Sequence, residues 1–543
     1  MATSPLEASP RKMGMPLLIG STLFTAVLAV SWLALPEAEQ AQGTLPKLNL
    51  DLLETTASGI SSGAFMATQM AVAHSDSIKG VAVTAGGPYF CAGKESWSGA
   101  GLSKAIARCM QGDPMFPVSA ITEDDQRLMR ETTQRWAKEG KIDPLDRLVR
   151  QKVWIFHGYN DGIVKTPVSN ALETYYRAFV PAHQIFHKRE LPAAHAQISA
   201  ACANSENETG ASCNVCDVTG GNFINVCSVD KTPYDAAGMA LQFFYGPMQR
   251  TASDQLKGKL LSFNQALYTL MDDRKIKPDK ISMAGEGYLY VPQSCLEGKA
   301  CRLHIAFHGC QQNAGKINMD FVKSAGYNEW AEQNHLVVLF PQAASSAMLP
   351  MNPNACWDWW GYNDTGDRHA GHYATKNGFQ IAAVWRMVQA LANPDEREEG
   401  KQSADEQVVK NPAHEILLTA PVAQVLDVSS SQVLLTWEAV PNAATYRVYR
   451  LMPGLDPGDK GEPTFLMVTP EDFTGTAYVD DGLKEKTLYQ YRVTALDEAG
   501  KETSASSLTA QTSGLPPACD PYYSMLMECT VDRHGLPTDS RCP

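Results

Sequence analysis

One serine near the start of the chain has the sequence context of a catalytic nucleophile. Ser61 is the centre of a Gly-x-Ser-x-Gly frame with Gly59 and Gly63. Such a frame is typical of a nucleophile elbow, a tight turn between a strand and a helix from which the serine side chain projects. In a chain of 543 residues the frame also arises by chance, so the neighbouring sequence must decide whether it has this role.

A serine hydroxyl attacks a carbonyl only when a base takes its proton, and the base needs an orienting carboxylate. Asp161 follows the apolar run "VWIFHG", and His195 lies 34 positions later in the small-residue loop "LPAAHAQIS". The order Ser, Asp, His along the chain is the one that elbow-type hydrolases use. We therefore predict a triad of Ser61, Asp161 and His195.

Other residues compete for these roles. Alternatively, Asp161 is an ordinary aspartate in a turn and His195 is an ordinary histidine on the surface. Asp235 in "YDAAG" is a second candidate for the acid. His157 and His308 are further candidates for the base, although their His-Gly pairs directly after strands favour a role in shaping the backbone. His304 lies in the middle of a predicted strand, which favours the core.

Two main-chain amides are predicted to stabilise the oxyanion. The first is the amide of Ser62, directly after the nucleophile, and the second is that of Cys310 in "FHGCQQN". This loop comes about 250 residues after the serine, whereas the corresponding loop ordinarily precedes the elbow. A circular permutation explains the order, with late strands in the places of early ones. The alternative is a simple turn in which Cys310 is one half of a disulfide.

The elements that must position these groups alternate between strands and helices over residues 45–392. Four short apolar runs end in Gly or Pro and predict buried parallel strands, and two longer runs predict helices. The alternation predicts an α/β fold with its site at the carboxyl ends of the strands. The strand runs are Gly80–Gly87, Lys152–Gly158, Leu303–Gly309 and Leu336–Gln342, "LNLDLLETTASG" is the strand expected to enter the elbow, and the helices are Gly63–Ser75 and Asn377–Leu391.

The pattern changes after residue 392. Residues 393–418 are polar and charged, as in a solvated linker, and residues 419–513 show the period-two alternation of an antiparallel β-sandwich. Trp437, and Leu483 with Tyr489 six positions later, resemble a fibronectin type III module with its tyrosine corner. The cysteine-containing tail 514–543 is too short for an independent core without disulfides.

The N-terminus predicts export. Residues 1–41 hold Arg11 and Lys12, then the charge-free run 15–35, and then polar sequence. This segment is either a cleaved signal peptide or a retained single-span anchor, so a membrane is involved only in the second case. Thirteen cysteines fit an oxidising compartment, where most of them form disulfides.

Composition argues against several partners. A net charge of −13 is opposite to the basic surface that nucleic acids favour. No metal and no cofactor are expected. Cys213 and Cys216 form a single C-x-x-C in a loop that favours disulfides, and His369 and His372 have no third ligand beside them.

A cluster of indoles is the expected substrate surface. Trp357, Trp359 and Trp360 lie in "CWDWWGY", beside the predicted active face. Aromatic faces bind methyl and methylene groups without hydrogen bonds. We expect at least one of the three to belong to the core and another to contact substrate.

Six ordered segments within residues 45–391 together resemble the polyhydroxyalkanoate depolymerases, in particular the circularly permuted type that acts on poly(3-hydroxybutyrate). They are "GISSGAFMATQMA", "IFHGYNDGIV", "AAHAQIS", "PYDAAGMALQFFYG", "LHIAFHGCQQN" and "NPNACWDWWGYNDTGDRHAGHYATKNGFQ". The resemblance implies a circularly permuted α/β-hydrolase catalytic domain. It also implies the same triad (Ser61, Asp161, His195) and the same oxyanion amides (Ser62, Cys310).

The expected activity is therefore that of a secreted serine esterase on hydroxyalkanoate polyester, with the solid granule as one form of the substrate. Secreted members of this group often append a fibronectin-like module and a polymer-binding domain. Two features depart from the family pattern, namely the short tail after Ser513 and the insertion "DRHAGH". Two alternatives stay open, an esterase for soluble oligomers or other short esters and a surface adhesion protein with a degenerate hydrolase domain.

Overall fold

The computed structural model describes residues 43–93, 100–112, 118–201, 213–364, 371–392, 418–451 and 464–516. Residues from Gly43 onward form one compact unit. Among the described residues no helix has the length and apolar character needed to cross a bilayer. The predicted N-terminal signal or anchor, nearly all of the linker 393–418 and most of the tail lie outside the described residues.

An eight-stranded sheet is the centre of the α/β domain. Six neighbouring strands are parallel, and β13 is antiparallel to both of its neighbours. The strands in spatial order are β10 (Lys259–Asn264), β13 (Glu286–Val291), β15 (Leu336–Phe340), β14 (Arg302–Phe307), β1 (Thr55–Ile60), β2 (Ile78–Thr84), β3 (Lys152–Phe156) and β4 (Ile185–Lys188).

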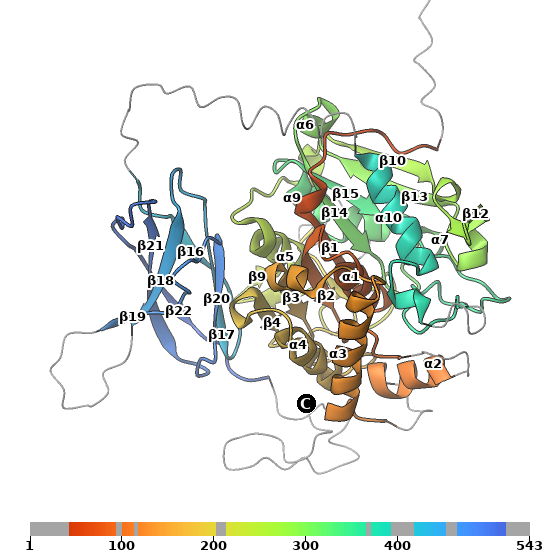
Figure 1. The fold of residues 1–543 in the computed structure, drawn as a ribbon, viewed down its shortest axis with the longest axis horizontal. Helices are drawn as coiled ribbons and strands as arrows, with labels where there is room; N and C mark the ends of the chain where they lie inside the picture. The colour runs from red at the N-terminus through yellow and green to blue at the C-terminus, as the bar shows by residue number, and fades with distance from the viewer. Residues whose placement is uncertain are drawn as a thin grey trace, which may run out of the picture. The chain divides into compact units, whose positions relative to one another are not determined.

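The topology confirms the predicted circular permutation. β1, which carries the elbow, lies in the interior of the sheet between β14 and β2. The four strands on the β14 side all come from residues 259–340, whereas the three on the other side follow β1 directly in the chain. Figure 1 shows this as a red-orange β1 beside the green β14 and β15. The loop after β14 therefore reaches the elbow across the sheet.

Helices cover both faces of the sheet, because alternate residues of each strand point to opposite faces. Val81 and Val83 of β2 belong to one apolar cluster with α1 (Ser62–Ala73), α3 (Glu123–Lys138), α4 (Thr166–Arg177) and α10 (Phe379–Leu391). Ala82 belongs to the other cluster, with α5 (Ala236–Tyr245), α8 (Asp320–Ser324) and α9 (Tyr327–Ala331). The remaining short elements are α2 (Ala100–Lys104), α6 (Gln293–Leu296), α7 (Ala314–Ile317), β5 (Gln197–Ile198), β6 (Asn214–Val215), β7 (Ile224–Val226), β8 (Ser228–Val229), β9 (Thr232–Pro233), β11 (Leu270–Met271) and β12 (Arg274–Lys275).

The strand that enters the elbow is shorter than the sequence pattern suggested. Asp51 caps a 3₁₀ turn over Leu52–Glu54 by accepting a hydrogen bond from Leu53, and the strand begins only at Thr55. Every residue of β1 and of α1 is buried. The small residues of this strand and helix allow both elements to lie in the centre of the domain.

The C-terminal module is a β-sandwich with the fibronectin type III strand arrangement, as predicted. Its buried centre contains Trp437, and the hydroxyl of Tyr489 accepts a hydrogen bond from the Lys484 amide at 2.9 Å. This bond closes the predicted tyrosine corner. The sheets are β16 (Ala423–Val428), β17 (Gln432–Trp437) and β20 (Ala477–Asp481), and β19 (Phe465–Met467), β18 (Thr445–Leu451), β21 (Leu488–Leu496) and β22 (Ser506–Gln511).

One glutamine of the sandwich pairs with the edge strand of the large sheet. The Gln432 side-chain oxygen accepts from the His187 amide at 2.9 Å, and its nitrogen donates to the Ile185 carbonyl at 2.9 Å. Edge strands leave such groups unpaired. The side-chain amide therefore takes the place that the peptide of a ninth strand would have.

We predict that Gly63→Ala destabilises the α/β domain by about 3 kcal/mol, the upper end of the usual cost of overpacking, because the new methyl group has no space. A Cβ at Gly63 would lie 2.4 Å from the carbonyl oxygens of both Phe307 and His308. Gly285→Ala is the matched control, since a Cβ there meets nothing within 4 Å. Denaturant unfolding measures both, and equal stabilities of the two variants would contradict the prediction.

Candidate active site

Ser61 lies at the sharp turn between β1 and α1. Its backbone has φ 56° and ψ −124°, a conformation that costs energy for a residue with a side chain. Its amide donates to the Thr84 carbonyl at the end of β2 at 3.0 Å. Gly59 and Gly63 touch each other here, because a Cβ on Gly59 would lie 2.2 Å from the Gly63 carbonyl oxygen. The frame therefore has the strained geometry and the close backbone contact of a nucleophile elbow.

Helix α1 begins directly after the turn at Ser61. The first amides of a helix have no acceptor within the helix, and here the amides of Ala64 and Phe65 already bond the Ser61 carbonyl. The Ser62 amide precedes them and donates no hydrogen bond among the described residues, which suits it to bind an anion. The Ser62 hydroxyl accepts a hydrogen bond from the Trp357 amide at 3.3 Å, which holds the start of the helix against the tryptophan segment.

The loop after β14 lies directly over the elbow. A Cβ on Gly309 would be 3.3 Å from the Ser61 Cβ. Cys310 follows, and its side chain forms a disulfide with Cys356. The Gln311 amide donates to the Asn354 carbonyl at 2.7 Å. The Cys310 amide, by contrast, donates no hydrogen bond within the described parts of the chain.

Asp161 and His195 form a buried pair. His195 Nδ1 donates to Asp161 Oδ2 at 2.8 Å, and Asp161 Oδ1 accepts from the amides of Ile163 and Val164 at 2.8 and 3.0 Å. Both side chains are buried. Burial by itself would raise the pKa of Asp161, but the charge and hydrogen bond of His195 lower it below its ordinary value. The carboxyl is therefore an ionised acceptor.

Backbone contacts fix the loop that carries His195. The His195 amide donates to Thr219 Oγ1 at 3.2 Å, and the Ala194 amide donates to the Cys216 carbonyl at 2.9 Å. Gly158, in the loop after β3, packs so closely that a Cβ there would lie 2.1 Å from the Ala193 carbonyl oxygen. The loops after β3 and β4 are thus in direct contact.

The competing residues have other contacts. Asp235 caps α5 by accepting from the Gly238 amide, and it also accepts from Trp330 Nε1 at 2.9 Å. His195 is bonded to Asp161 and not to Asp235. His304 is buried in β14, with its ring nitrogens bonded to the hydroxyls of Thr56 and Ser58.

The two His-Gly histidines are both fully buried, and burial lowers the pKa of each to about 4. His308 Nδ1 bonds the Gly309 carbonyl at 2.7 Å, and its Nε2 accepts from the Ala343 amide at 3.0 Å. His157 has no hydrogen-bond partner for either ring nitrogen within the described ranges. Since both nitrogens of His308 are bonded to backbone groups, its ring shapes the loop after β14.

The cysteines of the C-x-x-C pair are not free. Cys216 forms a disulfide with Cys227, and Cys213 is also disulfide-bonded. The prediction that this loop holds disulfides is therefore confirmed. Three other disulfides join Cys91–Cys109, Cys295–Cys301 and Cys310–Cys356. The part of the chain that the structure describes has no cluster of metal-binding side chains, and His369 lies outside that part.

The three tryptophans differ in exposure. Trp357 is fully buried against Phe307, with ring centroids 5.1 Å apart. Trp359 is also buried and stacks on Phe65 at 4.0 Å. Both belong to the core, as expected for at least one of the three. Trp360 is only partly buried and packs edge-to-face against Trp359.

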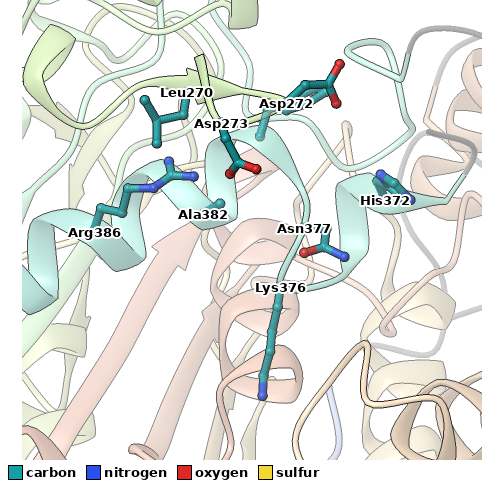
Figure 2. A pocket seen from close by; sticks show the side chains of 9 residues that line it. Leu270, Asp272, Asp273, His372, Lys376, Asn377, Ala382 and Arg386 are labelled. Atoms are coloured by element: carbon teal, nitrogen blue, oxygen red, sulfur yellow. The ribbon is translucent and has the colours of Figure 1, made fainter. Parts of the chain in front are cut away.

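Two cavities outside this site lie along α10. One of about 320 Å³ is shown in Figure 2, where Asp273 of the β11–β12 turn lies near Arg386 of the helix. His372 and Lys376 also line it. The second cavity, of about 400 Å³, includes His74 and Trp385. Ser61 and His195 line neither cavity.

The permuted sheet and the strained serine turn define an α/β-hydrolase. The chain is 34% identical to the poly(3-hydroxybutyrate) depolymerase of Delftia acidovorans over 468 residues, 85% of this chain and 80% of that protein. It is 30% identical to the polyhydroxybutyrate depolymerase of Talaromyces funiculosus over 375 residues, 67% of this chain and 97% of that protein. No family model matches the chain. The chain belongs to the poly(3-hydroxybutyrate) depolymerase family.

Solved structures agree with this assignment. A PHB depolymerase from Penicillium funiculosum has a TM-score of 0.53 and 29% identity, covering 64% of this chain and 98% of that one. A serine-to-alanine PHB depolymerase in complex with an R3HB trimer has a TM-score of 0.52 over the same shares, also at 29% identity.

Several supporting residues were not singled out from the sequence. Asn352 bonds the Ala344 and Cys356 carbonyls and the Cys356 amide, which shapes the segment that leads to the tryptophans. Thr219 supports the His195 loop, and Gln312 supports the oxyanion loop. These contacts depend on how the loops fold back on themselves, which no motif in the sequence marked.

The buried histidines predict a loss of stability in acid. Burial lowers the pKa of His304 to about 3 from 6.5, so the unfolded chain takes up this proton below about pH 6.5 while the folded chain does not. Stability is fully present above pH 6.5 and falls as the pH falls toward 3. His304→Gln should remove about 1.4 kcal/mol per pH unit from the slope of unfolding free energy between pH 6 and pH 4. Denaturant unfolding across this range measures the slope, and an unchanged slope would contradict neutral burial of His304.

Proposed function

We propose that this chain is a secreted serine esterase that hydrolyses poly(3-hydroxybutyrate)-type polyester through Ser61, His195 and Asp161. The observation that carries the proposal is the buried hydrogen bond of 2.8 Å between His195 and Asp161, on loops that follow β3 and β4 at the same edge of the parallel sheet as the elbow after β1. Relatives of the same family are named depolymerases of this polyester. One related structure holds an R3HB trimer, a short piece of the chain.

The ionised carboxylate of Asp161 fixes the tautomer of the base. Because a carboxylate only accepts hydrogen bonds, His195 keeps its proton on Nδ1 and offers the lone pair of Nε2. The lowered pKa of Asp161 maintains this arrangement over the neutral range. Asp161 then stabilises the imidazolium as it forms.

The reaction follows from these roles. Ser61 Oγ attacks the ester carbonyl while His195 Nε2 takes its proton, and the tetrahedral oxyanion accepts hydrogen bonds from the Ser62 and Cys310 amides. The chain alcohol leaves with the proton from His195. Water, deprotonated by the same imidazole, then attacks the acyl-enzyme and releases the acid. No cofactor takes part in these steps.

The indole of Trp360 is the proposed contact for the apolar parts of the polyester, since Trp357 and Trp359 are packed into the core. A partly exposed aromatic face binds methyl and methylene groups through their apolar area. The ester groups themselves are held by the oxyanion amides.

An exposed apolar loop supports binding to solid polymer. Met348, Leu349 and Met351 have exposed fractions of 79%, 92% and 60%. Two backbone hydrogen bonds between Ser346 and Asn352 close the base of this loop. A polar solvent disfavours such a tip, whereas the methyl-rich surface of the polyester removes it from water.

The apolar loop is connected to the proposed site. It precedes Cys356, whose disulfide reaches Cys310 in the oxyanion loop. On the His195 side, Val215 and Val218 are exposed in the segment that bonds the His195 loop. Contacts of both loops with a granule would place the proposed site of Ser61 and His195 against the polymer surface.

Export is part of the proposal. The segment 1–41 has the composition of a signal or anchor, and disulfides persist in an oxidising compartment. The polyester granule is then met outside the cytoplasm.

Loss of one triad member is predicted to abolish efficient turnover. Asp161→Asn keeps the shape but removes the charge, so we expect kcat on a soluble short ester to fall by about 10⁴-fold. Ser61→Ala should abolish both turnover and labelling by a serine-directed phosphonate. The rates and the labelled fraction are measured with protein of verified folding.

The outcomes separate the candidate functions. Labelling of the wild type but not of Ser61→Ala excludes an adhesion protein with a degenerate site. Clearing of a poly(3-hydroxybutyrate) suspension by the wild type excludes an esterase restricted to soluble oligomers. Labelling of Ser61→Ala at the wild-type rate would contradict the proposal.

Removal of the apolar tip is predicted to weaken adsorption selectively. In a Ser61→Ala background, Leu349→Ser should lower the affinity for polyester granules by about 10-fold, since burial of one leucine contributes about 1.5–3 kcal/mol. Leu53→Ser is the matched control, because this exposed leucine precedes β1 at the opposite end of the strand from Ser61. Adsorption isotherms measure the effect, and identical isotherms for the two variants would rule out this loop as the contact surface.

A further inference from the structure

Gln312 lies in the oxyanion loop and is almost entirely buried, with 1% of its surface exposed. Its Oε1 accepts from the Gly309 amide at 2.7 Å. Its Nε2 donates to the carbonyls of Asn222 and Phe223 at 3.1 and 2.9 Å. Both N–H groups of the side-chain amide are therefore used, and the carbonyl is used as well. Such a fully bonded buried amide has one orientation.

The contacts of Gly309 determine where the Cys310 amide points. The Gly309 carbonyl accepts from His308 Nδ1 at 2.7 Å and from the main-chain amide of Gln312 at 3.2 Å. His308 carries its proton on Nδ1 because its Nε2 accepts from the Ala343 amide. The Gly309 carbonyl and the Cys310 N–H belong to one planar trans peptide and point in opposite directions. Fixing the carbonyl thus fixes the direction of the N–H.

Gln312 holds the other side of the same residue. By accepting from the Gly309 amide, it fixes the peptide that precedes Gly309. The peptides on both sides of Gly309 are then constrained. Gln312 Oε1 holds the preceding peptide, and His308 Nδ1 with the main-chain amide of Gln312 holds the following one. Glycine needs such constraints, because its backbone has more freedom than that of any other residue.

The opposite end of the Gln312 side chain reaches the segment that supports His195. The Phe223 carbonyl, which accepts from Gln312, also accepts from the Gln197 amide at 2.9 Å. Gln197 begins β5, two residues after His195, and β5 pairs with β7 just after Phe223. One side chain therefore joins the loop of the oxyanion amide to the loop of the base.

We propose that Gln312 is a positioning residue that aims the Cys310 amide at the oxyanion and holds its loop in register with the His195 loop. This inference rests on the proposed esterase function. Oxyanion donors lower the barrier only when they are aligned before the charge develops. Gln312 supplies that alignment through Gly309, without contact with the substrate.

The test replaces Gln312 by methionine, which has similar length and no hydrogen-bonding amide. With a soluble short ester, Gln312→Met should lower kcat by about 10- to 100-fold, because removal of one oxyanion donor costs about 10²- to 10³-fold. KM should stay within about 3-fold, since ground-state binding does not use this amide. Gln311→Met is the matched control, as Gln311 is exposed and adjacent. It should keep wild-type kcat.

A second readout separates positioning from a merely structural role. The affinity for a trifluoromethyl ketone, which forms a tetrahedral adduct with the serine, should fall by the same factor as kcat/KM in Gln312→Met. A protein that is only less stable would keep both values when assayed well below its melting temperature. If Gln312→Met does not fold, Gln312→Leu replaces it in the same measurements, since it also removes the acceptor for the Gly309 amide and the donors to Asn222 and Phe223 without burying a charge.

The outcomes are distinct from those of the proposed function. A kcat and a trifluoromethyl ketone affinity within 2-fold of wild type in the folded Gln312 variant would overturn this inference, while activity that depends on Ser61 still supports the esterase. Absence of esterase activity in the wild type would overturn both.

Discussion

The close approach of three backbone segments at one point is the constraint on which the rest of the structure depends. The turn at Ser61, the start of α1 and the end of β14 pack together with no space for additional side-chain atoms at Gly59 and Gly63. This packing holds Ser61 at φ 56° and brings the loop of Gly309 over it. A conformation that is unfavourable in isolation persists because the surroundings determine it completely. The reactive centre is therefore a product of backbone packing more than of side-chain contacts.

The permuted chain order is compatible with this centre, because the position of a strand in the sheet matters and its position in the sequence does not. β14 follows β1 by more than 240 residues, yet it is the direct neighbour of β1 in the sheet. Its loop supplies the Cys310 amide, and the disulfide to Cys356 joins that loop to the tryptophan segment. On the other side of β1, the loops after β3 and β4 bring Asp161 into contact with His195. Both halves of the sheet thus end at one rim.

Much of the fold could be predicted from the sequence, because short apolar runs that end in Gly or Pro indicate parallel strands wherever they pair. The sheet was predicted in this way and is confirmed. The permutation was predicted from the late position of the loop after β14, and the sandwich with its tyrosine corner from period-two alternation; both are confirmed. The predicted start of β1 was wrong. Asp51 caps a 3₁₀ turn over Leu52–Glu54, and the apolar pattern of this segment does not distinguish the turn from a strand. The loop sequence around Cys213 and Cys216 favoured disulfides over a metal pair, and the structure confirms that both cysteines are disulfide-bonded. The supporting role of Gln312 could not be predicted, because the Asn222 carbonyl that its Nε2 binds comes from a segment 90 residues away.

The most direct test of the central claim is a crystal structure of the protein after reaction with a serine-directed phosphonate. The expected adduct is on Ser61, with one phosphoryl oxygen within hydrogen-bond distance of both the Ser62 and Cys310 amides and with His195 Nε2 beside the leaving-group oxygen. An adduct on Ser61 whose phosphoryl oxygens contact neither amide, or an adduct on another serine, would contradict the account of a preorganised acyl-transfer site.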